Sequence, residues 1–187
     1  LSVTIYANDK IGYDLTNIVA VWPGDYISLK IEPLNTPENN ITVAYSFAFV
    51  ADIDGEFLML GGSGIPVSEG FNPLITSHPA YDWIYAENIN QEMTRAMTLK
   101  KFYTRLTTAP GSGDSRTLGV RVNSVTRLSV TISEDDVAGN DLVNTWGCSA
   151  YDLLAILETQ VGTPASAYAH WGVVGYIAGP FNYPGYY

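Results

Sequence analysis

The sequence predicts an all-β protein built from antiparallel sheets packed as a β-sandwich. Three observations lead to this expectation. The 187 residues are 47% hydrophobic and 15% charged, as in a folded chain with a sizeable core. Thirteen tyrosines and six phenylalanines are spaced by seventeen glycines and ten prolines, a composition of strands and turns. Helical periodicity is weak, and the opening of the chain is repeated later.

The repeat defines the domain organisation. The chain opens with LSVTIYANDKIGYDL, and LSVTISEDDVAGNDL follows from residue 128. A shift of 127 residues aligns residues 1–52 with residues 128–179 without a gap and gives fourteen identities. This period is longer than the roughly 20–50 residues of a solenoid unit and matches a whole sandwich domain. We therefore expect residues 1–52 to be the C-terminal half of a repeat (the half-repeat), residues 53–179 a complete repeat, and residues 180–187 a separate C-terminal arm (the aromatic arm).

The half-repeat raises a question of completion. Half of a sandwich cannot bury its apolar face by itself. We expect it to be completed either by sequence preceding Leu1 or by another chain, as in strand-complemented filaments.

Within the complete repeat, short runs rich in β-branched and aromatic residues lie between Gly, Pro, Asn and Asp clusters. Leu128, Val130 and Ile132 alternate with polar residues, which predicts one buried face. A Gly-rich loop is expected at 109–115 and a tight turn at 122–125. One short helical turn is predicted within 89–101. The predicted strands are 56–62, 83–88, 101–108, 117–123, 127–133, 153–159 and 169–178.

A resemblance can be stated on these residues. The string FYTRLTTAPGSGDSRTLGVRVNSVTRLSVTIS, followed by Asp152, Gly162-Thr163-Pro164 and Trp171, resembles the tandem jelly-roll domains of phage virion and bacterial surface proteins. The resemblance implies a C1q/TNF-like or capsid-like sandwich of two Greek keys. It also implies a virion or extracellular location. Asn123-Ser124 departs from the usual Asn-Gly turn, and Tyr151-Asp152 replaces the Gly24-Asp25 of the first copy.

Charge and cysteine content exclude several classes. The formal net charge is −10 with nine scattered basic residues, so no nucleic-acid partner is expected. The single cysteine, Cys148, cannot form an internal disulfide. No run approaches the roughly 18 apolar residues of a membrane span, so no membrane partner is expected.

No catalytic residues are predicted. Imidazoles are limited to His78 and His170, and no Gly-x-Ser-x-Gly, HExxH or P-loop motif is present. We therefore expect a protein that is not an enzyme.

An acidic turn occurs in both copies and is the best ligand candidate. Several carboxylates around a glycine suit Ca²⁺, although the spacing is not that of an EF-hand. A solvated turn, in which Asp and Asn bond their own backbone, explains the same residues. Calcium is the one cofactor considered, and its candidate ligands are Asp9, Asp14, Asp135, Asp136 and Asp141.

Aromatic residues are the other notable feature. Trp22, Trp83, Trp146 and Trp171 could fill the core, form an interface or stack on a sugar. The aromatic arm contains two prolines and a glycine, which cannot continue a central strand, so it is expected to pack on a neighbouring subunit. Its interface residues are Phe181, Tyr183, Tyr186 and Tyr187. Asn40 begins an N-glycosylation sequon.

These observations predict a non-enzymatic structural protein of a virion or an extracellular fibre or surface assembly. Its partner is expected to be itself, as a homo-oligomer or polymer joined by the half-repeat and the aromatic arm. The alternative is a carbohydrate- or receptor-binding surface or tail-fibre module, with a glycan as partner.

Overall fold

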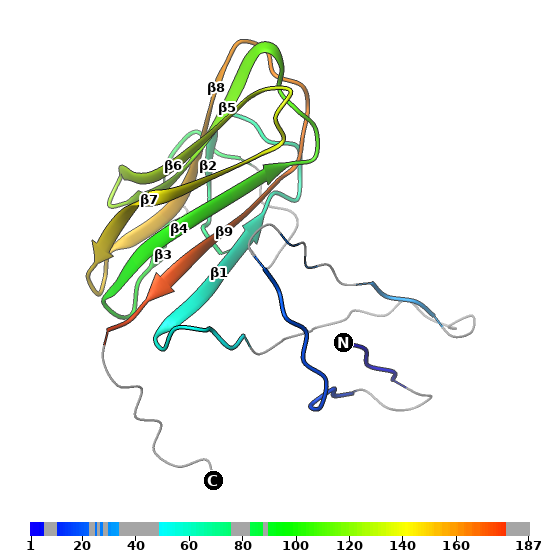
Figure 1. Cartoon of the computed structure of the whole chain (residues 1–187). Helices are drawn as coiled ribbons and strands as arrows, with labels where there is room; N and C mark the ends of the chain where they lie inside the picture. Colours follow the sequence, from blue (N-terminus) through cyan, green and yellow to red (C-terminus); the bar gives the residue numbers. More distant parts are fainter. Residues whose placement is uncertain are drawn as a thin grey trace. The chain divides into compact units, whose positions relative to one another are not determined.

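The structure is a computed structural model that describes residues 1–5, 11–22, 25, 27, 30–33, 49–75, 83–87 and 90–178. The chain divides into two compact units, Leu1–Tyr45 and Ser46–Tyr187. All strands of the described residues belong to the second unit, and every one of them pairs antiparallel (Figure 1).

The described residues of this unit form nine strands in two sheets. The first sheet has four strands in the order β1-β9-β4-β7, and the second has the order β2-β8-β5-β6, with β3 pairing to β8. The bounds are β1 Glu56–Gly62, β2 Gly70–Asn72, β3 Gln91–Glu92, β4 Met97–Leu106, β5 Gly111–Val122, β6 Val125–Glu134, β7 Ala138–Cys148, β8 Leu153–Val161 and β9 Ala169–Tyr176. The prediction of an all-β fold of antiparallel sheets is confirmed.

The core lies between the two sheets and follows the period of two expected of half-buried strands. Leu128, Val130 and Ile132 of β6 are buried, as predicted from the alternation in the sequence. Strand β4 contributes residues on both sides of a bulge at Lys101, whose φ is 54°. This positive φ shifts the register so that Leu99 and Phe102 both reach the interior.

Strands β5 and β6 are joined by a two-residue turn at Asn123 and Ser124. Both residues have positive φ, 49° and 64°, as the primed hairpin turns require. The turn therefore lies where the sequence predicted it. The Asn123 side chain compensates for the missing glycine by donating to Asp152 (2.7 Å) and accepting from the backbone N–H of Leu153 (2.9 Å).

Three local predictions were wrong. The helical turn within 89–101 is replaced by β3 and the start of β4, because Met97 and Leu99 alternate with period two. Of the described residues 83–87 in the strand predicted at 83–88, only Ile84 forms a bridge, to Phe71. Most of the loop expected at 109–115 belongs to β5, which begins at Gly111. Strand β7 was not predicted as a strand, because most of its residues are exposed and its apolar residues do not alternate with polar ones.

Candidate functional site

Asp141 of β7 forms a clamp between β6 and β7. It is buried, and its carboxylate accepts hydrogen bonds from the backbone N–H groups of Ser129 (3.1 Å), Val143 (3.3 Å) and Asn144 (3.0 Å). The amide of Asn144 donates to both carboxylate oxygens. Burial opposes ionisation of Asp141, but these bonds outweigh it and hold its pKa below the ordinary value. The clamp therefore requires the ionised carboxylate.

The half-repeat contains the same clamp at the positions 127 residues earlier. Asp14 accepts from the backbone N–H groups of Ser2 (3.2 Å) and Asn17 (3.1 Å). The Asn17 amide also donates to both oxygens of Asp14, at 2.9 and 3.1 Å. These bonds, led by that of the Asn17 side chain, lower the pKa of Asp14 to about 2. Asp14, Asn17 and Ser2 thus repeat the geometry of Asp141, Asn144 and Ser129.

A second turn is shared at the same offset. The carboxylate of Asp25 accepts from the N–H of Trp22 (2.7 Å), and the N–H of Asp25 donates to the Trp22 carbonyl (3.0 Å). In the complete repeat, Asp152 and Ser149 make the same two contacts, at 2.8 and 3.3 Å. The turn between Ser149 and Asp152 precedes β8. The matching turn between Trp22 and Asp25 therefore stands at the position in the sequence where a β8-like segment would begin.

A close backbone approach is also shared. A Cβ added at Gly139 would collide with the side chain of Val130, and a Cβ added at Gly12 would collide with that of Val3. Both glycines therefore allow the segment after the acidic turn to lie against the segment before it.

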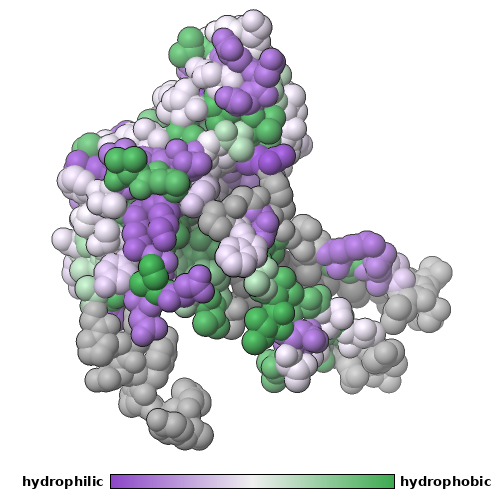
Figure 2. All heavy atoms as spheres, viewed as in Figure 1, coloured by the Kyte–Doolittle hydropathy of each residue, from purple (hydrophilic) through white to green (hydrophobic). Residues whose placement is uncertain are grey.

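The two copies differ in what covers them. Leu128, Val130 and Ile132 are 1–4% exposed, whereas the identical residues Leu1, Val3 and Ile5 are 48–70% exposed. Figure 2 shows apolar side chains at the surface beside polar ones. Other apolar residues of the half-repeat with large exposed fractions are Ile11, Leu15, Ile18, Val19, Val21, Trp22, Ile27 and Ile31. The half-repeat therefore has the turns of the complete repeat without its cover.

The pairing pattern explains the difference. Every strand pair of the described sheets joins one of β1–β5 to one of β6–β9. No pair forms within β6–β9, because consecutive strands lie in different sheets, and β5 separates β6 from β8 as β4 separates β7 from β9. Residues 1–52 align in sequence with β6–β9 alone, so strands of this kind formed there would find no pairing partner within residues 1–52.

The acidic residues proposed for calcium are only partly brought together. Asp135 and Asp136 are exposed beside the β6–β7 connection, and Asp9 lies outside the described residues. The oxygens of Asp14 and Asp141 are occupied by N–H donors. Among the described residues, no three Asp, Glu, His or Cys side chains gather so as to hold a metal ion. Calcium binding stays a prediction, and the solvated-turn alternative accounts for Asp14 and Asp141.

The tryptophans have different environments. Trp83 and Trp171 are buried and pack edge to face, with ring centroids 6.1 Å apart. The guanidinium of Arg127 covers Trp146 at 3.4 Å from the ring centroid. Trp22, in the half-repeat, is exposed. Two of the four tryptophans are thus part of the core.

Several predicted residues lie outside the part of the chain that the structure describes. His170 is described and exposed on β9. The residues outside are Phe181, Tyr183, Tyr186 and Tyr187 of the aromatic arm, together with Asn40 and His78.

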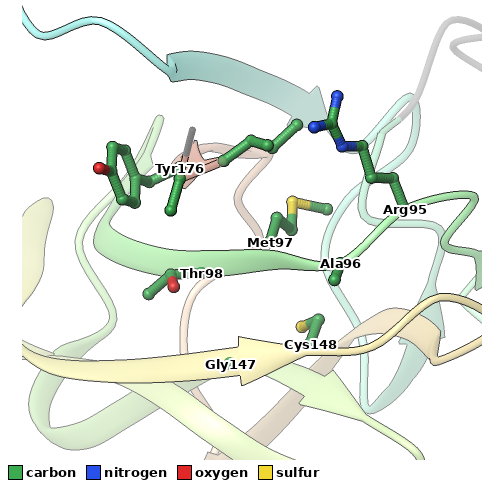
Figure 3. A pocket seen from close by; sticks show the side chains of 9 residues that line it. Arg95, Ala96, Met97, Thr98, Gly147, Cys148 and Tyr176 are labelled. Atoms are coloured by element: carbon green, nitrogen blue, oxygen red, sulfur yellow. The ribbon is translucent and has the colours of Figure 1, made fainter. Parts of the chain in front are cut away.

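An open depression of about 380 Å³ lies where β4 begins and β7 and β9 end (Figure 3). Met97 and Cys148 are among its lining residues. Burial, together with the negative charge of Asp152, raises the pKa of Cys148 to about 11, so the thiol stays protonated near neutral pH. This environment is unsuited to a cysteine nucleophile.

A buried ion pair was missed at the sequence level. The Arg116 guanidinium donates to the Glu158 carboxylate at 2.8 Å, and both side chains are almost fully buried. Arg116 also donates to the backbone oxygens of Pro164 and Ala165. Burial raises the pKa of Glu158 above its ordinary value, although the bond from Arg116 acts in the opposite direction. A glutamate inside the apolar run LLAILET was the available signal.

The described residues contain no helix that is long and apolar enough to cross a membrane. No protein-family model and no curated protein matches the chain.

Proposed function

We propose that the chain is a non-enzymatic structural protein of a virion or of an extracellular fibre or surface assembly, which associates through the half-repeat and the aromatic arm. One observation carries the proposal. Leu1, Val3 and Ile5 are exposed, while their identical counterparts 127 residues later form the buried face of β6. Apolar residues that are buried in one copy and exposed in the other are candidates for an interaction site.

The proposal includes a jelly-roll topology for the complete repeat. Its support is the nested pairing of β1 with β9, β2 with β8, β4 with β7 and β5 with β6. Rolling up one long antiparallel hairpin of eight strands produces this pattern, and such folds recur in capsid and lectin domains.

The proposal also includes the duplication of the repeat unit. Its support is the agreement between the two clamps, around Asp14 and Asp141, and between the two turns, around Asp25 and Asp152. Because these contacts recur at one constant offset, we interpret residues 1–52 as four strands of a sandwich that lack their other half.

The test compares two adjacent substitutions in the full chain, Val3→Asp and Thr4→Asp. Val3 belongs to the apolar face, whereas the counterpart of Thr4 in β6, Thr131, points to solvent. We expect the full chain to associate with rising concentration in sedimentation velocity, and Val3→Asp to reduce this association while Thr4→Asp preserves it. A chain that stays monomeric, or two variants that behave alike, would contradict the proposal.

The aromatic arm is tested in the same assay. A chain ending at residue 179 should associate less than the full chain, because free apolar rings favour contact with a neighbour. Unchanged association would remove the arm from the proposed interface.

The alternative function, glycan or receptor binding, would use exposed aromatic rings. Trp22, Tyr85 and Tyr151 are exposed enough for stacking on a sugar. Binding on a glycan array that Trp22→Ala or Tyr151→Ala abolishes would favour this alternative over the structural role.

A further inference from the structure

Unpaired polar atoms gather at one place in the interior of the complete repeat. Within the described residues, seven buried side-chain nitrogen or oxygen atoms have no hydrogen-bond partner, and five of them belong to four residues that are only 0–6% exposed. We call these four residues the inner polar cluster, which consists of Asn72, Trp83, Arg116 and Glu158. Buried polar atoms in folded proteins nearly always have a partner, so this concentration of exceptions requires an explanation.

Asn72 and Glu158 are neighbours through the pairing of β2 with β8. Asn72 stands opposite Ile156, so Glu158 is its diagonal neighbour on the inner face of the sheet. Diagonal neighbours lie about 7–8 Å apart, within reach of long side chains. Gly70, directly opposite Glu158, has no side chain that could meet the carboxylate. One carboxylate oxygen of Glu158 accepts from Arg116, and the other is unpaired within the described residues.

Trp83 approaches the cluster from the other side of Asn72. Phe71 and Ile84 form an antiparallel bridge with backbone hydrogen bonds of 2.8 and 3.2 Å, so Trp83 is the residue opposite Asn72. The side chain of Trp83 is buried, and its indole N–H finds no acceptor among the described residues. Asn72 therefore has an unpaired donor on one side and an unpaired carboxylate oxygen on the other.

The unpaired atoms of the cluster include both donors and acceptors. The donors are Nδ2 of Asn72, Nε1 of Trp83 and Nε of Arg116, and the acceptors are Oδ1 of Asn72 and Oε2 of Glu158. Turning the Asn72 amide over exchanges two atoms that are both unpaired, so it leaves the deficit unchanged. The N–H donors and the charge of Arg116 oppose a metal ion, and the carboxylate of Glu158 opposes an anion. Water both donates and accepts, so its chemistry fits the cluster.

We propose that the inner polar cluster is an internal binding site for water and holds at least two molecules. A buried water makes about three hydrogen bonds and at most about four, so one molecule cannot satisfy five unpaired atoms. The waters bridge groups that are too far apart for a direct hydrogen bond. They fasten β2 and the segment around Trp83 to β8, because β2 pairs with β8 over only three residues. This site goes beyond the proposed function and does not depend on it.

Trp171 provides an internal reference for the test. Its indole N–H donates to the backbone oxygen of Leu74 at 2.7 Å, whereas that of Trp83 has no acceptor in the described residues. In the full chain, NMR cross-relaxation with water is measured at both indole N–H protons and at the side-chain amide of Asn72. We expect cross-peaks with the sign of a tightly held water at Trp83 and Asn72, and none at Trp171. If Trp83 shows no such cross-peak, protein groups satisfy the cluster directly and the inference fails.

Two matched substitutions assign the waters to the cluster. Asn72→Leu removes two of the five unpaired atoms at similar side-chain volume, and Ile156→Val trims the residue opposite without touching any of them. Magnetic relaxation dispersion of the water signal counts long-lived waters in each chain. We expect Asn72→Leu to lose at least one long-lived water and Ile156→Val to keep them all. An unchanged count in folded Asn72→Leu would overturn the inference, and if this variant does not fold, the cross-peaks of the unaltered chain decide.

Discussion

Replacing Asp141 by alanine should destabilise the complete repeat, whereas the same change at Asp14 should leave it unaffected. Asp141 is 7% exposed and accepts from Ser129, Val143 and Asn144. A hydrogen bond to a charged group contributes about 1.5–3 kcal/mol. We count the 3.1 Å bond from Ser129 in full, because it joins β6 to β7. The other two contribute roughly 0.5 kcal/mol each, since water can replace the carboxylate at exposed N–H groups.

The expected loss is therefore about 3 kcal/mol in the free energy of unfolding, or roughly 10 °C in the melting temperature of a domain of this size. Urea titration followed by tryptophan fluorescence and calorimetry measures both values. Asp14→Ala is the matched control, because Asp14 makes the same contacts within the other unit. A loss below about 1 kcal/mol for Asp141→Ala would refute the reasoning, because it is less than one charged hydrogen bond.

The pH dependence of the free energy of unfolding provides an independent test of the contribution of Asp141. The pKa of Asp141 is lower in the folded chain than in the unfolded chain, where it is about 3.9. Its contribution is thus fully present above the unfolded pKa and is lost as pH falls through the folded pKa. The stability difference between the wild-type chain and Asp141→Ala should stay constant at neutral pH and narrow below about pH 4. If the stability difference between the wild-type chain and Asp141→Ala became larger in acid, the lowered pKa of Asp141 in the folded chain would be contradicted.

Three further predictions concern the interior of the complete repeat. Glu158→Ile should lower the free energy of unfolding by about 3–5 kcal/mol, and adding Arg116→Leu should recover most of it; equal stability of the single and double variants in urea would contradict this. In the folded chain at pH 8, Cys148 should react with a thiol reagent about 100-fold more slowly than an exposed thiol, because its pKa is raised to about 11; rapid labelling without unfolding would oppose this. Gly61→Ala should lower the free energy of unfolding by about 1–3 kcal/mol, because the added Cβ would collide with the indole of Trp171 and the backbone oxygen of Leu74. Gly147→Ala has open space at its Cβ and should change the free energy of unfolding by less than about 0.5 kcal/mol. Similar melting temperatures of the two variants would contradict this packing argument.

The sequence predicted those features that depend on local patterns. The alternation of Leu128, Val130 and Ile132 correctly placed β6, and the turn at Asn123 correctly ended β5. Strand β7 was missed because it is an edge strand whose exposed residues carry no apolar alternation. The expected helix failed because packing in β4 overrides the helix propensity of its Met, Leu and Lys residues.

The candidate site depended more on tertiary structure. Fourteen identities indicated that residues 1–52 are half of a repeat. Calcium binding at the acidic turns stays a prediction, and the N–H donors around Asp14 and Asp141, which only the structure shows, agree with the solvated-turn alternative. The Arg116–Glu158 pair could not be predicted, because its two members are 42 residues apart and meet only through the pairing of β5 with β8.

The pairing pattern explains why half of a repeat with this strand order would need a partner. In an up-and-down sheet, consecutive strands pair, so half of a domain keeps its hairpin ladders. Here the strands β6–β9 alternate between the two sheets, and each forms its backbone hydrogen bonds with strands of β1–β5. Turns held by a side chain, such as those of Asp14 and Asp25, need no ladder and persist in the half-repeat. Strands like β6–β9 would need a ladder, and under the proposed function a complementing half would supply it.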